Sequence, residues 1–142
     1  MMPTMKKKVH FLCTGNSARS QMAEAIVNAQ LGSLWEAFSA GTHPTGYVHP
    51  MALRVLEEYN IHHNGKSKNV AEFRNQTFDL VVTVCDSAAE ECPIWLGSGK
   101  RVHISFPDPA KATGSEDEIL EKFRQVRDDI AQKITTLLKQ HS

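Results

Sequence analysis

The sequence predicts a single α/β domain over residues 1–142, with a four-stranded parallel sheet flanked by helices on both faces. Two observations predict it. Short apolar runs typical of strands alternate with segments of helical periodicity, which is the pattern of a parallel sheet covered by helices. The run at 79–84 is largely apolar, as a strand buried on both faces should be. A chain of 142 residues, 41% hydrophobic and 23% charged, is long enough to bury a core of its own.

Each element follows from the local sequence. The predicted strands are residues 9–12, 35–40, 79–84 and 101–105. The predicted helices are residues 20–31 and 50–59, a helical turn at 69–74, and a last helix that begins at Ser115. Glu118, three residues after Ser115, completes a capping box at the start of that helix. The buried stripe predicted for it is Ile119, Phe123, Val126, Ile130, Ile134 and Leu137.

Charge and hydropathy exclude several kinds of partner. Lys plus Arg equals Asp plus Glu, 16 each, so the formal net charge is zero. A neutral domain gives no support for nucleic acid or an anionic membrane as a partner. The apolar stretch 9–13, which follows Lys6, Lys7 and Lys8, is too short for a signal peptide or a membrane span. We therefore expect a cytoplasmic protein, and we expect a monomer.

The three cysteines, Cys13, Cys85 and Cys92, are an odd number, which does not suit a secreted disulfide framework. In a reducing cytosol their thiols are expected to be free at rest, so that any disulfide is transient and functional. The sequence has no Cys-x-x-Cys pair, and its seven histidines do not fall at metal-ligand spacing beside the cysteines. No metal and no cofactor is expected.

An anion-binding loop is predicted where the first strand meets the first helix. It opens at Cys13, and its oxyanion-binding residues are Thr14, Gly15, Asn16, Ser17, Ala18, Arg19 and Ser20. Small and turn-forming residues let successive backbone N–H groups curl around one anion, and the helix N-terminus points at the same spot. Arg19 adds a planar fork of donors, and this setting favours Cys13 as a thiolate nucleophile. The alternative is a buried cysteine ahead of an ordinary capped helix.

The chemistry is predicted to gather at one edge of the sheet. Cys13, Cys85 and the segment after Ser105 each follow a predicted strand, and ligands of parallel sheets bind at the carboxyl ends of the strands. Asp108, between two prolines, is a candidate general acid at this edge. From spacing alone, an ordinary surface turn is an equally good interpretation.

Residues 13–24, Cys-Thr-Gly-Asn-Ser-Ala-Arg-Ser-Gln-Met-Ala-Glu, resemble the signature of low-molecular-weight protein tyrosine phosphatases and of the thioredoxin-coupled arsenate reductases that share their fold. The resemblance continues through Ser39-Ala40-Gly41, the central strand and Asp108-Pro109, and so covers nearly the whole chain. It implies a single α/β domain with a four-stranded parallel sheet, and it assigns the role of general acid to Asp108.

Two features place the chain nearer the reductases. Phosphatases of this fold usually have a tyrosine after the Asp-Pro pair, whereas this chain has Ala110. Reductases have two further cysteines after the central strand, and Cys85 and Cys92 match them. The alternative is that both are inert buried cysteines.

The resemblance implies an oxidoreductase of arsenical resistance. Cys13 would attack arsenate held by the loop and Arg19, while Asp108 protonates the departing hydroxyl. The disulfide would then pass from Cys13–Cys85 to Cys85–Cys92, and thioredoxin would reduce it. Glutaredoxin is an alternative reductant. Two other functions stay open: a tyrosine phosphatase that hydrolyses aryl phosphates through a Cys13 phosphoenzyme, and a non-catalytic oxyanion-binding protein.

Residues 86–91 contain good helix formers, so we expect a short helix between Cys85 and Cys92 in the reduced protein. Such a helix would hold the two α-carbons roughly 10 Å apart, whereas a disulfide needs about 4.4–6.8 Å. The segment is therefore expected to unwind when the two cysteines oxidise.

Overall fold

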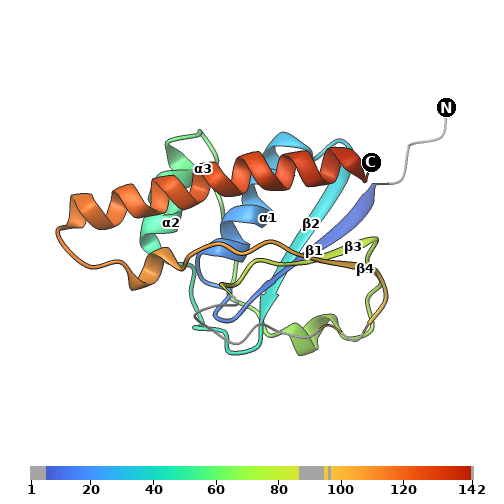
Figure 1. Ribbon diagram of the computed structural model, residues 1–142. Helices are drawn as coiled ribbons and strands as arrows, with labels where there is room; N and C mark the ends of the chain where they lie inside the picture. The colour runs from blue at the N-terminus through green and yellow to red at the C-terminus, as the bar shows by residue number, and fades with distance from the viewer. Residues whose placement is uncertain (1–5, 87–94, 96, 142) are drawn as a thin grey trace.

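The computed structural model describes residues 6–86, 95 and 97–141. Its centre is one parallel sheet made of β1 (Lys7–Cys13), β2 (Trp35–Gly41), β3 (Leu80–Thr83) and β4 (Lys100–His103). The strand order is β2-β1-β3-β4, so β1 and β3 occupy the middle (Figure 1). The predicted four-stranded parallel sheet is confirmed.

Helices cover both faces of the sheet, but unequally. The α-helices are α1 (Arg19–Gln30), α2 (Pro50–Glu57) and α3 (Glu116–Gln140), and the short 3-10 helices are η1 (Val70–Phe73) and η2 (Pro109–Lys111). The three α-helices share one face, where their buried side chains join Val9 and Phe11 of β1 in the larger core (Figure 1). On the other face, η1 supplies Phe73 to a smaller core that includes Leu12 of β1.

The longest helix, α3, closes the larger core. Ser115 Oγ accepts a hydrogen bond from Glu118 N at 3.2 Å, and the Glu118 carboxylate accepts one from Ser115 N at 3.3 Å, so the predicted capping box is confirmed. The predicted stripe is wrong by one position at each end: Leu120 and Leu138 are buried, whereas Ile119 and Leu137 are only partly buried. Periodicity allows either neighbour, and the angle at which α3 packs on the sheet decides between them. No described helix is both long and apolar enough to cross a membrane.

Other element boundaries lie within one or two residues of the prediction. The second helix, α2, ends at Glu57 because the chain turns back there. Tyr59 N and Asn60 N donate to Leu56 O and Glu57 O, and Asn60 adopts a left-handed φ of 59°. A residue in that conformation commonly ends an α-helix.

The strand ends bring the predicted chemistry to one edge of the sheet. Cys13, the last residue of β1, lies opposite Gly41 of β2. On the other side of β1, Val84 N donates to Leu12 O at 2.8 Å, so Cys85 follows beside the end of β1. The segment after β4 carries Asp108.

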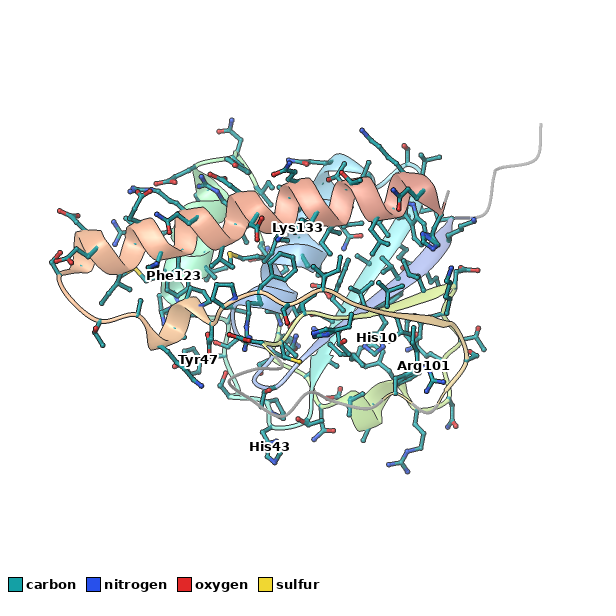
Figure 2. The ribbon with its side chains drawn as sticks, viewed as in Figure 1. His10, His43, Tyr47, Arg101, Phe123 and Lys133 are labelled. Carbon is teal, nitrogen blue, oxygen red and sulfur yellow. The ribbon has the colours of Figure 1, made fainter. Side chains whose placement is uncertain are left out.

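The smaller core encloses His10 of β1 (Figure 2). Its ring is fully buried and stacks on Phe78 with ring centroids 4.3 Å apart, and it also contacts the rings of Phe73 and Trp95. Neither ring nitrogen has a hydrogen-bond partner among the described residues. Burial, together with the charge of Lys68, lowers the pKa of His10 to about 3, so the ring stays neutral in the folded protein.

His10 should make the fold sensitive to acid. The unfolded chain protonates this group near its ordinary pKa of 6.5, whereas the folded chain does so only near pH 3. Its contribution to stability is therefore complete above pH 6.5 and is lost as the pH falls, by about 2 kcal/mol at ~pH 5. In His10→Phe this loss disappears, so the free energy of unfolding should decrease less between ~pH 7 and ~pH 5 than in the parent, measured by urea titration.

The exposed His43 provides the matched control, because His43→Phe removes an imidazole that solvent already reaches. Its stability should follow that of the parent at each pH. A parallel pH dependence for His10→Phe and the parent would contradict the assignment.

Candidate active site

The anion loop is held in place through its carbonyl oxygens. Its carbonyl oxygens at Thr14, Gly15 and Ser17 accept hydrogen bonds of 2.9–3.0 Å from the backbone N–H groups of His43, Thr45 and His49, which follow β2. The α1 helix begins behind Ala18, whose methyl group cannot cap it, and its first turn has no acidic residue. These features leave the N-terminal N–H groups of α1 suited to an oxyanion.

Cys13 accepts two hydrogen bonds at the end of β1. Its sulfur lies 2.8 Å from Ser20 Oγ and 3.2 Å from Asn16 N, and the residue is 2% exposed. The Asn16 side chain sets the direction of the first bond, because its Oδ1 accepts from Lys68 N at 2.7 Å and its Nδ2 therefore donates to Ser20 Oγ at 2.8 Å. The hydroxyl hydrogen of Ser20 is then left for the sulfur. Two hydrogen-bond donors therefore point at the sulfur of Cys13.

Arg19 and Asp108 face the same space. Arg19 is 4% exposed, and its Nη1 donates to Phe106 O at 3.2 Å. Its Nη2 lies 3.6 Å from Asp108 Oδ2. The other oxygen of that carboxylate accepts a hydrogen bond from Ala110 N at 3.0 Å and so caps η2. The fold thus brings the predicted acid beside the predicted oxyanion-binding arginine.

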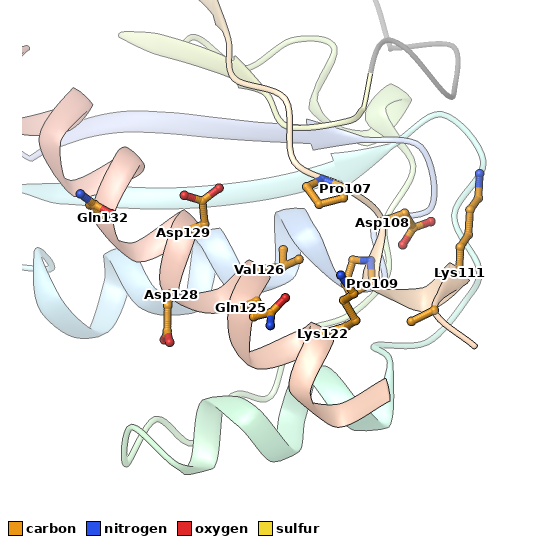
Figure 3. A pocket seen from close by; sticks show the side chains of 11 residues that line it. Pro107, Asp108, Pro109, Lys111, Lys122, Gln125, Val126, Asp128, Asp129 and Gln132 are labelled. Atoms are coloured by element: carbon orange, nitrogen blue, oxygen red, sulfur yellow. The ribbon is translucent and has the colours of Figure 1, made fainter. Parts of the chain in front are cut away.

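A cavity of about 660 Å³ lies beside the segment that carries the acid. Pro107, Asp108 and Pro109 form one wall, and Gln125 and Val126 of α3 lie across from them (Figure 3). None of residues 13–20, all of which the structure describes, lines this cavity. It is therefore separate from the oxyanion site, and it leaves unfilled space between the acid segment and α3.

Cys85 is fully buried two residues after the end of β3, and it is disulfide-bonded, whereas Cys13 is a free thiol. Cys92 lies outside the described residues, and so does most of the predicted helix between the two cysteines. In the part of the chain that the structure describes, no group of three or more His, Cys, Asp or Glu side chains could hold a metal ion.

Gly41 permits the close approach of β2 to the anion loop. A Cβ atom at this position would lie 2.4 Å from Thr14 O and 3.0 Å from Asn16 N. The sequence predicted Gly41 as the residue that ends the strand 35–40 and as part of the family resemblance, but it did not predict this close approach. The available signal was the run of small residues that it completes, Ser39-Ala40-Gly41.

Residues 8–142 match the low molecular weight phosphotyrosine protein phosphatase family. The chain belongs to this family. Among its relatives in the phosphatase family, an arsenate reductase of Halalkalibacterium halodurans is 44% identical over 132 residues, which are 92% of this chain and 94% of the relative. The resemblance inferred from residues 13–24 is thus confirmed.

Solved structures of arsenate reductases share the fold of this chain. The crystal structure of arsenate reductase from Archaeoglobus fulgidus matches with a TM-score of 0.78 and 32% identity, over 92% of this chain and 98% of the other. A structure described as an arsenate reductase in oxidized state matches with a TM-score of 0.78 and 28% identity, over 96% and 99%.

Gly41→Ala should displace the anion loop, because its new methyl group would meet backbone atoms that cannot rotate away. Phosphate has the tetrahedral shape that the loop suits, and we expect the variant to bind it about tenfold more weakly, measured by calorimetric titration. Gly46→Ala is the control, since its Cβ would meet nothing within 4 Å. The positive φ of Gly46 lowers the stability of that variant but leaves phosphate binding unchanged. Phosphate binding of parental strength in Gly41→Ala would show that β2 can retreat from the loop.

Proposed function

We propose that the protein is an arsenate reductase, which converts arsenate to arsenite through a relay of Cys13, Cys85 and Cys92. The observation that carries the proposal is the position of Cys85 two residues after β3, beside the strand end where Cys13 accepts two hydrogen bonds. An oxyanion loop alone suits a phosphatase equally well. A second cysteine beside the nucleophile supplies two electrons, which reduction requires and hydrolysis does not. The similarity to arsenate reductases supports the same conclusion.

Sheet geometry supports a disulfide between the first two cysteines. Because Leu12 pairs with Thr83, the register carried forward aligns Cys13 with Val84, and Cys85 follows one residue later. Strands ~4.8 Å apart that rise ~3.3 Å per residue place the two α-carbons roughly 6 Å apart. A disulfide spans about 4.4–6.8 Å. Side chains alternate faces along a strand, and Val84 shares the larger core with Cys13, so the backbone at Cys85 must turn to direct its sulfur toward Cys13.

In the first step, the Cys13 thiolate attacks arsenic while the loop N–H groups and Arg19 bind the arsenate oxygens. A hydroxyl leaves arsenic, and Asp108 protonates it so that it departs as water. The loop donors and Arg19 stabilise the negative charge on the remaining oxygens. The product is a sulfur–arsenic(V) adduct on Cys13.

In the second step, the Cys85 thiolate attacks the Cys13 sulfur. The sulfur–arsenic bond breaks and leaves its electron pair on arsenic, so arsenic(V) becomes arsenic(III) and a Cys13–Cys85 disulfide forms. The Cys92 thiolate then attacks Cys85, which frees Cys13 and forms a Cys85–Cys92 disulfide. A free Cys13 together with a disulfide-bonded Cys85 agrees with this final stage.

A dithiol reductant must restore the oxidised enzyme, and we propose thioredoxin acting on a cytoplasmic monomer. Its dithiol would attack the disulfide and carry away two electrons as its own disulfide. Arsenate-dependent NADPH oxidation with thioredoxin and thioredoxin reductase tests this, with glutathione and glutaredoxin as the comparison. Oxidation only in the glutaredoxin mixture would replace thioredoxin, and oxidation in neither mixture would overturn the reductase.

The second candidate is a tyrosine phosphatase, which the family membership and the shared anion loop favour. Cys13 would then accept the phosphoryl group, and Asp108 would protonate the phenolate that leaves. Ala110, which follows the Asp-Pro pair, is exposed and offers no aromatic wall for the substrate. Suppose that p-nitrophenyl phosphate, assayed without a reductant, is turned over faster than arsenate assayed with thioredoxin. That result would favour the phosphatase. A non-catalytic oxyanion-binding protein would turn over neither.

Cysteine variants separate these functions. Cys13→Ser should abolish both arsenate reduction and aryl-phosphate hydrolysis, because a hydroxyl lacks an accessible anion at neutral pH. Cys85→Ser and Cys92→Ser should abolish multiple-turnover reduction and spare any hydrolysis, because only reduction uses the relay. Steady-state NADPH oxidation and p-nitrophenol release measure the two activities. Reduction at the parental rate by either relay variant would refute the relay.

Asp108→Asn should slow the first chemical step by about 10²–10⁴-fold, because an amide cannot deliver the proton that the leaving hydroxyl needs. Arsenate binding should change little, since Arg19 and the loop donors remain. Rapid-quench measurement of arsenite formed in a single turnover tests the rate, and calorimetry tests the binding. A single-turnover rate equal to that of the parent would remove Asp108 from the mechanism.

A further inference from the structure

Gln21, the third residue of α1, is fully buried behind the anion loop. Its Nε2 lies 2.7 Å from Lys66 O, 3.0 Å from Asn16 Oδ1 and 3.2 Å from Asn16 O. All three partners are carbonyl oxygens, which only accept, so the amide nitrogen must face them. The oxygen of the same amide, Oε1, then faces His63 Nε2 at 2.8 Å. His63 must therefore donate to Gln21.

These bonds form one chain in which every donor points toward the nucleophile. His63 donates to Gln21, Gln21 donates to Asn16 Oδ1, and Asn16 Nδ2 donates to Ser20 Oγ. Ser20 in turn donates to Cys13 Sγ. Aligned hydrogen bonds polarise one another, by perhaps 10–30% per bond in condensed-phase estimates. The donors thus act together on the charge of the sulfur.

Gly65 allows His63 to contact Gln21 at the outer end of this series of hydrogen bonds. A Cβ atom on Gly65 would lie 2.2 Å from His63 Nε2 and 2.4 Å from Gln21 Oε1, so only glycine leaves room for this bond. His63 and Gly65 line a surface cavity of about 480 Å³, together with Glu24 of α1. Water therefore has access to His63, at the outer end of the series of hydrogen bonds.

Burial is the main reason that His63 stays a neutral donor. Burial and the nearby Lys68 lower its pKa, while Glu24 Oε2 lies 3.8 Å from its Nε2. Burial also raises the pKa of Glu24, against the opposing effects of Lys68 and Ser39. A neutral imidazole carries a single N–H, and here Nε2 carries it toward Gln21.

We propose that Gln21 and His63 are positioning residues for Cys13, which favour its thiolate through the directed hydrogen bonds of Asn16 and Ser20. The inference rests on the proposed function only in taking Cys13 as the nucleophile. Neither residue touches the substrate. If Gln21 or His63 no longer donates, the side chains of Asn16 and Ser20 can reorient. The hydrogen bond from Ser20 to the Cys13 sulfur is then weaker.

Alkylation of Cys13 by iodoacetamide tests this without arsenate, because only the thiolate reacts. The rate is followed across about pH 5–9 by mass spectrometry of the peptide that carries Cys13. We expect Gln21→Leu and His63→Phe to lower the rate at ~pH 6 about fivefold and to move the midpoint of the profile to higher pH, because rearrangement of Asn16 and Ser20 would remove about one typical hydrogen bond from the sulfur. His63→Gln, which retains a side-chain N–H donor, should stay within about twofold of the parent.

His62→Phe is the matched control, since the neighbouring imidazole is exposed and pairs with Glu57 instead. It should reproduce the parental profile. His63 lies near the surface, so His63→Phe keeps the test available if Gln21→Leu does not fold, as judged by circular dichroism. Identical alkylation profiles for His63→Phe and His62→Phe would overturn the proposal. Equal loss in His63→Phe and His63→Gln would also overturn it, because ring packing rather than donation would then be the cause.

The same variants distinguish this inference from the proposed function. Arsenate reduction should fall in proportion to the alkylation rate, measured as kcat/KM with thioredoxin. If the parent reduces no arsenate but His63→Phe still shifts the alkylation profile, the reductase is refuted and the positioning role stands.

Discussion

The anion loop depends on the side chain of Asn16. The residue is fully buried and has a φ of 47°, in the left-handed region that glycine and asparagine tolerate best. Its amide accepts from Lys68 N and Gln21 Nε2 and donates to Ser20 Oγ. A glycine would adopt the angle but lose the bonds to Gln21 and Ser20 and remove the acceptor of Lys68 N, which costs about 1–3 kcal/mol. One side chain thus ties the loop to α1 and to the segment before η1.

The parallel sheet places the loop's neighbours. Because β1 lies between β2 and β3, both sides of Cys13 are occupied by a strand end. On one side the small Gly41 lets the backbone of β2 support the loop. On the other side the chain beyond β3 carries Cys85 past the nucleophile. The same topology therefore provides a support for the loop and, in the proposed function, a redox partner for Cys13.

The two cores hold β1 from opposite faces with different chemistry. The α-helical face is almost wholly apolar, and Phe11 is packed there without exposure. The opposite face encloses His10 among aromatic rings, which give it stacking but no hydrogen bond from the described residues. Burying an unpaired polar ring costs free energy, which the surrounding aromatic packing offsets. Cys13, at the end of the same strand, is therefore held in place from both sides.

Local patterns were enough to predict the four strands, the Ser115 capping box and the loop that begins at Cys13. Each depends on periodicity or turn chemistry within a few residues. The end of α2 and the ends of the buried stripe of α3 could not be predicted from local sequence, because tertiary packing decides them. The clearance at Gly41 and the hydrogen bond of His63 also depended on the tertiary structure, because they exist only once distant segments meet. The bond from His63 to Gln21 spans 42 residues and that from Lys68 to Asn16 spans 52, and neither separation leaves a trace in local sequence.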